Sequence, residues 1–180
     1  MHPRTSELLD HLRTQRAILR LAYDAAPPNL RELRPAPDRW SIAGVIEHLA
    51  LVERRVATVL QDGLRAALAT APLPPLRDVA PFLPQVDPTA ILDRERRIAA
   101  HTSLHPARGL DGEAAWVALH ASTQQVLDLT HQADGLDTST VRSPHPVFGL
   151  LDFAHWISFL GYHEARHAAQ IRATTTALLG

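Results

Sequence analysis

The sequence predicts an all-α protein, a four-helix bundle whose helices are joined by long crossover connections. Three observations predict this fold class. Apolar residues recur at helical spacing in four long segments, and proline-rich stretches separate those segments. The sequence also shows no alternating strand pattern, internal repeat or glycine-rich phosphate loop. Amphipathic helices bury their apolar faces against one another, and four long ones in a chain of this length form a bundle.

The first two helices are predicted over residues 5–26 and 41–69. Ser41 is a suitable N-cap for the second helix, because its hydroxyl can accept a hydrogen bond from the first helical turn. The apolar face of the first helix is formed by Leu8, Leu12, Leu19 and Tyr23. The apolar stripe of the second helix is formed by Ile42, Val45, Leu49, Val52, Val56 and Val59.

The third and fourth helices are predicted over residues 111–133 and 150–178. Helical spacing brings together one set of mainly apolar residues on each of them. On the third helix the set is Trp116, Leu119, Thr123, Val126 and Leu127. On the fourth helix the set is Phe153, Trp156, Leu160, Ile171 and Leu178.

The connections are long. Residues 27–40 and 70–110 exceed what a simple hairpin turn needs, so at least one crossover or surface excursion is expected. Prolines occur in both intervals and again in "SPHPVFG", residues 143–149, which precedes the fourth helix. Residues 88–104 have the spacing of a further short helix, although their arginine-rich pattern is less regular.

The composition limits the class of function. A chain of 180 residues with 46% hydrophobic residues is expected to form a single domain over residues 1–180. A formal net charge of −1 argues against nucleic acid or an anionic membrane as a partner. Without cysteine there is no disulfide, thiolate ligand or thiol nucleophile. No signal-peptide pattern and no long apolar run is seen, so a cytoplasmic protein is expected.

The segment "GYHEARHAAQI", residues 161–171, contains an H-E-x-x-H pattern formed by His163, Glu164 and His167. Both histidines fall in the apolar stripe of the fourth predicted helix, one turn apart. An unpaired polar group inside a core costs about 1–3 kcal/mol, so each ring needs a partner. The pair therefore predicts either a shared metal ion or two core histidines bonded to protein acceptors. The pair alone does not decide between these alternatives.

The H-E-x-x-H pattern is best known from zinc peptidases, in which its glutamate, here Glu164, is the general base. Such peptidases take a third ligand from downstream of the second histidine. The residues after His167, "AAQIRATTTALLG", contain no Asp, Glu or His. No strand is predicted either, and a peptidase needs a strand edge to hold an extended peptide. The peptidase is therefore a minor alternative.

A third ligand is available upstream. His48 lies on the flank of the apolar stripe of the second helix, from which it can reach a facing helix. A single histidine there is more often a satisfied boundary residue, and its case depends on the inward pair. With His163 and His167 it would form a three-histidine metal site with an open coordination position, as in catalytic sites. Three imidazoles suit zinc, nickel or iron about equally.

Other polar residues are weaker candidates. Glu164 is the one obvious general base beside such a site. Glu53 can either hydrogen-bond a ligand histidine or pair with an arginine. His120 is expected at the inner edge of the third helix. The histidines expected in loops or at the surface are His101, His105, His131, His145 and His155.

Two stretches resemble a known family. "RWSIAGVIEHLALVE" (39–53) and "HPVFGLLDFAHWISFLGYHEARHAAQI" (145–171) are similar to the DinB-like, or YfiT-like, metalloenzyme superfamily. "LHPARGLDGEAAWVALHASTQQVLDL" (104–129) fits its third helix. The shared features are a Trp-Ser start to the second helix, a histidine near its middle, an HP.FG motif, and H-x-x-x-H followed by QI.

The resemblance implies a bundle of up-down-down-up order that is often a homodimer, with a divalent metal held by three histidines. By position these are His48, His163 and His167. Related proteins include thiol S-transferases that use bacillithiol or mycothiol, and mycothiol-dependent isomerases. We therefore expect a metal-dependent transferase acting on a small-molecule substrate. The alternatives are a non-enzymatic, metal-bound stress-related bundle and a metal-dependent hydrolase or peptidase.

Overall fold

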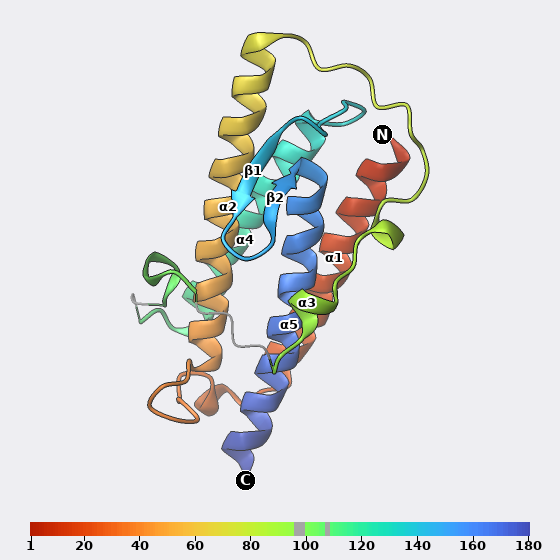
Figure 1. Cartoon of the computed structure of the whole chain (residues 1–180). Coiled ribbons are helices and arrows are strands. Elements are labelled where there is room, and N and C mark those ends of the chain that lie inside the picture. Colours follow the sequence, from red (N-terminus) through yellow and green to blue (C-terminus); the bar gives the residue numbers. More distant parts are fainter. Residues whose placement is uncertain (96–99, 107–108) are drawn as a thin grey trace.

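Four long helices make up most of the chain in the computed structural model, which describes residues 1–95, 100–106 and 109–180 (Figure 1). The helices are α1 (Pro3–Asp24), α2 (Ile42–Thr70), α4 (Gly112–Gln132) and α5 (Phe153–Leu179). α1 packs along α5, α2 packs along α4, and α2 also contacts α5. The predicted all-α four-helix bundle is therefore confirmed.

Side-chain caps explain where three of these helices begin. The Ser41 hydroxyl accepts a hydrogen bond from the Gly44 amide at 3.0 Å, as predicted. Asp111 caps α4 in the same way, at 2.8 Å from the Ala114 amide. Asp152 caps α5 through a 2.9 Å bond from the His155 amide. Each cap satisfies one of the amide groups that the first turn of a helix leaves without an intrahelical acceptor.

The direction of the helices requires one long crossover. α2 returns antiparallel to α1, α4 runs parallel to α2, and α5 returns parallel to α1 (Figure 1). The chain between α2 and α4 therefore travels back along the whole bundle. It contains the short helix α3 (Thr89–Leu92), which lies against α5, and a 3₁₀ turn at Thr102–Leu104. These are the described parts of the short helix expected over 88–104, and residues 96–99 lie outside the described residues.

A small hairpin precedes α5, and the expectation that the chain has no strand is wrong. β1 (Arg142–His145) pairs antiparallel with β2 (Gly149–Asp152), from Arg142 opposite Asp152 to His145 opposite Gly149. The strands are too short for an alternating pattern, and Pro144 inside β1 suits only an edge strand. Gly149 has φ of 75°, which glycine adopts without strain. Residues 150–152, which were predicted to begin the fourth helix, belong to β2 instead.

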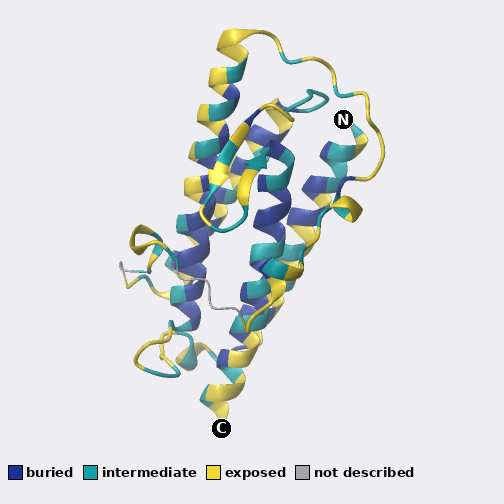
Figure 2. Cartoon of the chain, in the orientation of Figure 1, coloured by how far each residue is buried: buried dark blue, intermediate teal, exposed yellow. Residues whose placement is uncertain are grey.

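The core lies between the helices, and their outward faces are exposed (Figure 2). The predicted apolar face of α1 is fully buried, as is the stripe of α2 except for half-buried Val59. The His11 side chain of α1 packs directly on Gly161 of α5, where a Cβ atom would lie 2.2 Å from His11 Nε2. Among the described residues, no helix has the length and apolar character that crossing a membrane requires.

Candidate metal centre

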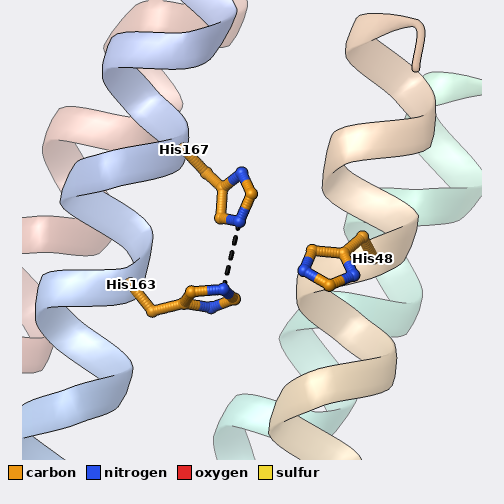
Figure 3. A group of neighbouring side chains, drawn as sticks. All are labelled: His48, His163 and His167. Atoms are coloured by element: carbon orange, nitrogen blue, oxygen red, sulfur yellow. Dashed lines mark hydrogen bonds between the residues drawn. The ribbon is translucent and has the colours of Figure 1, made fainter. Parts of the chain in front are cut away.

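Three histidines from two helices face one another inside the bundle (Figure 3). His48 comes from α2, and His163 and His167 come from α5. One ring nitrogen of each lies within 4.8 Å of the other two, and the Nε2 atoms of His163 and His167 are 3.1 Å apart. Nitrogens that share a tetrahedral zinc ion are about 3.4 Å apart, so the three rings lie close to the spacing that one shared ion requires.

The crossover orients His48. The Nδ1–H group of this ring donates a 2.8 Å hydrogen bond to the carbonyl oxygen of Leu104, in the turn Thr102–Leu104. The ring also lies 4.7 Å from the ring of Trp40, between centroids. With its proton held on Nδ1, His48 presents the lone pair of Nε2. Hydrogen bonds of this kind fix the tautomer and the orientation of a metal-ligating histidine.

The two histidines of α5 are oriented by their own helix. His167 Nδ1–H donates a 2.8 Å hydrogen bond to Gln170 Oε1, which leaves Nε2 for a ligand. His163 instead stacks on Phe159, with ring centroids 5.2 Å apart and planes 18° apart. His163 Nδ1 is buried and has no hydrogen-bond partner among the described residues. Packing rather than a hydrogen bond therefore positions the His163 ring.

Burial keeps these rings neutral. It lowers the pKa of His48 to about 4. Burial also lowers the pKa of His163 and of His167 well below the ordinary value, and the neighbouring histidines add to the effect. Neutral imidazole is the form that binds a metal ion. The donor set of three nitrogens without a carboxylate fits zinc, nickel or iron, and not the oxygen-seeking ions calcium and magnesium.

Glu164 does not join the histidines. Its carboxylate, in a residue 1% exposed, accepts hydrogen bonds from Arg16 on α1, at 2.6 Å from Nη2 and 3.1 Å from Nε. Arg16 Nη2 also donates to Glu53 at 2.6 Å, and the Thr123 hydroxyl donates to Glu53 at 2.7 Å. Burial, followed by the charge of Glu53, raises the pKa of Glu164 to about 8. Of the two alternatives for Glu53, the structure shows pairing with an arginine.

The other candidate histidines lie largely as expected, except that His120 does not lie at the inner edge of its helix, so that expectation is wrong. His101, His105, His120 and His131 are exposed, and His155 is half-buried. His145 is an exception to its predicted surface position, because the hairpin packs its ring 4.7 Å from Phe159 and 5.2 Å from Trp156. Burial there lowers the pKa of His145 to about 4.

The geometry separates this site from a peptidase. The third histidine comes from α2, upstream of the H-E-x-x-H pattern, and the glutamate of the pattern is bonded to Arg16 instead of standing beside the histidines. Sequence reasoning missed Arg16, the Leu104 carbonyl and the supporting roles of Phe159 and Gln170. Only the spacing of Phe159 and Gln170, close to one turn from a ligand histidine, was a usable signal.

Comparisons with known proteins give the family and the fold of the chain. The uncharacterized protein YuaE of Bacillus subtilis (strain 168) is 27% identical over 141 residues, which cover 77% of this chain and 79% of YuaE. The crystal structure of TT2238, described as a four-helix bundle protein, has a TM-score of 0.63 and 22% identity, and the match covers 94% of this chain and 98% of TT2238. At that identity TT2238 shows the fold alone. A model of the DinB superfamily matches residues 11–171, from α1 to the end of the histidine pattern, and the chain therefore belongs to the DinB superfamily.

Proposed function

We propose that the protein is a metal-dependent transferase that acts on a small-molecule substrate, with a divalent cation held by His48, His163 and His167. The observation that carries the proposal is the convergence of three neutral imidazoles from two helices, with ring nitrogens within 4.8 Å of one another. His48 and His167 are buried, and His163 is half-buried. Three protein ligands leave a coordination position for a further ligand, which distinguishes catalytic from structural zinc sites. The cation is zinc, nickel or iron in this proposal.

A divalent cation supplies Lewis acidity when bound and lowers the pKa of a coordinated thiol or water. The protein's own residues prepare the site for it. The Leu104 carbonyl and Gln170 hold protons on the Nδ1 atoms of His48 and His167, so that their Nε2 lone pairs stay free. Phe159 covers one face of the His163 ring. We propose no role as a general base for Glu164, because both its oxygens accept hydrogen bonds from Arg16.

The nucleophile in this proposal is a low-molecular-weight thiol such as bacillithiol or mycothiol. The chain has no cysteine, so a thiol nucleophile has to come from outside the protein. Such thiols are kept reduced in the cytoplasm, which is where we place the reaction. A homodimer is a further part of the proposal, and light scattering of the purified protein tests it.

Metal analysis tests the ligand set. We expect about one ion per chain after loading the wild-type protein with zinc, nickel or iron, and none in His163→Ala. His131→Gln, which changes an exposed histidine of α4, serves as the matched control and is expected to keep the ion. Stoichiometric metal in folded His163→Ala, measured by elemental analysis, overturns the three-histidine site.

A conjugation screen tests the reaction. Metal-loaded protein is incubated with electrophilic substrates and with bacillithiol, mycothiol, glutathione or water as competing nucleophiles. Turnover with a thiol, lost in His163→Ala, supports the transferase, whereas turnover with water alone indicates a hydrolase. Absence of turnover with every nucleophile indicates the non-enzymatic metal-bound bundle. Thermal unfolding with and without a chelator then shows whether the ion is a major source of stability.

A further inference from the structure

A second candidate site lies between α1 and α4, away from the histidines. A cavity of about 380 Å³ is lined there by ten residues of these two helices, and none of the three ligand histidines is among them. α1 and α4 pack against each other less closely than α1 packs on α5 or α2 on α4. The volume falls in the range of about 300–1,000 Å³ that small-molecule sites occupy.

The lining of this cavity combines apolar walls with positive charge. Leu12 and Leu127 are apolar, and Trp116 adds an indole ring. Arg16 and Arg20 line the cavity as well, with their guanidinium groups 5.9 and 5.0 Å from the Trp116 ring centre. None of the described residues that line the cavity carries a carboxylate. The lining thus complements a molecule that has an apolar body and a negative charge.

Arg16 is the charged group best placed to meet such a molecule. Its Nε and Nη2 groups donate to Glu164 and Glu53, while Nη1 has no hydrogen-bond partner among the described residues. The Arg16 side chain is 18% exposed, whereas those of Glu53 and Glu164 are 3% and 2% exposed. The two carboxylates therefore lie behind the guanidinium, which they hold in place at the cavity.

Arg20 is a second charged donor at this cavity. Arg20 is paired with Asp24 at 2.8 Å, but both side chains are 44–47% exposed. Exposed pairs of this kind contribute about 0–1 kcal/mol, so Arg20 can exchange Asp24 for a ligand. The Trp116 indole N–H is buried and has no acceptor among the described residues.

We propose that the α1–α4 cavity binds a small amphipathic carboxylate. Its charged group pairs with Arg16 and Arg20, and its aliphatic or aromatic body lies against Leu12, Trp116 and Leu127. The site is separate from the histidine centre, and its existence does not depend on the reaction proposed there.

Octanoate is the probe for this site, and the indole N–H resonance of Trp116 in ¹⁵N-labelled protein is the reporter. Trp116→Phe assigns this resonance among the three tryptophans of the chain. We expect octanoate to shift it saturably and octanol, which lacks the charge, to bind at least about tenfold more weakly. Equal affinity for the two compounds, or no saturable shift, overturns the proposal.

A matched pair of variants locates the binding. Ala17 is exposed and lines the cavity, so Ala17→Phe fills the cavity without removing a charge. Ala66→Phe places the same ring at an exposed position on α2. We expect Ala17→Phe to weaken octanoate binding at least about tenfold and Ala66→Phe to leave it unchanged. If Ala17→Phe instead lowers the mass of the protein in light scattering and leaves octanoate binding intact, the face is an interface between copies and the proposal is wrong.

Discussion

Two groups of polar side chains lie inside the same bundle, and α2 and α5 contribute to both, while Arg16 of α1 and Thr123 of α4 complete the second group. α2 contributes His48 to the histidine centre and Glu53 to a charged cluster with Arg16. α5 contributes His163 to the first group and its sequence neighbour Glu164 to the second. Successive residues of a helix point about 100° apart, so the neighbours His163 and Glu164 face two separate sites.

The two groups differ in how their polar atoms are accommodated inside the protein. In the charged cluster, Arg16 faces two carboxylates and Thr123 donates a further hydrogen bond, so opposite charges lie inside the protein. In the histidine centre, three neutral rings direct ring nitrogens toward one another, and the Nε2 atoms of His163 and His167 share a hydrogen bond. No acidic side chain of the described residues takes part. The charged groups of the cluster pair with one another, whereas the histidine centre is the group proposed to hold a cation. We therefore expect changes in the cluster to affect mainly stability and changes at the centre to affect mainly metal binding.

The largest effect is expected when the charged cluster loses its cation. Arg16→Met leaves Glu53 and Glu164 buried together without the cation that pairs with both, and removing one member of a buried ion pair costs about 3–5 kcal/mol. We expect the free energy of unfolding in urea to fall by that amount, while folded protein still binds one metal ion per chain. Arg65→Met, at an exposed position of α2, is the control and should change stability by less than about 0.5 kcal/mol. Equal unfolding free energies of Arg16→Met and Arg65→Met would contradict a stabilising role for the charged cluster.

A smaller effect is expected when the histidine centre loses a supporting hydrogen bond. Gln170→Ala removes the acceptor of the His167 Nδ1–H group without removing a ligand. Such partners contribute about 10- to 100-fold to metal affinity, so we expect that loss in competition with a chromophoric chelator. Gln125→Ala changes an exposed glutamine of α4 and is expected to bind metal like the wild type. Unchanged affinity in Gln170→Ala would mean that this bond does not orient the ligand.

Helical spacing predicted the four long helices and the inward direction of His163 and His167, because both follow from a local period of 3.6 residues. His48 was selected by its place on the flank of a stripe and by the family resemblance. The partners of these residues follow no local rule. The carbonyl that holds His48 belongs to Leu104, 56 residues away, and a backbone carbonyl has no sequence signature.

The cluster of Arg16, Glu53 and Glu164 was not predicted from the sequence. Nothing in the local sequence marks Arg16 among the 18 arginines, because its importance depends on which helices meet. Without Arg16, Glu164 looked like the base of an H-E-x-x-H site. The hairpin was missed for a similar reason, since four-residue strands are held by their pairing and not by their composition.

The smallest effect is expected for Glu164→Gln, which separates the two interpretations of Glu164. Glutamine resembles the protonated carboxyl group, and the pKa of Glu164 is raised from 4.5 to about 8, mainly by burial. At pH 6 we therefore expect the variant to lie within about 1 kcal/mol of the wild type in unfolding free energy and to keep its metal ion.

The pH dependence sharpens this test. Because the folded pKa is above the unfolded one, protonation of Glu164 stabilises the fold fully below about pH 4.5 and progressively less as the pH rises through 8. Glu164→Gln lacks this group, so its unfolding free energy should fall less than that of the wild type between pH 5 and about 8.5. A general base is distinguished by turnover, because any metal-dependent turnover would then be abolished in Glu164→Gln. Loss of turnover in folded, metal-loaded Glu164→Gln would assign Glu164 to the histidine centre.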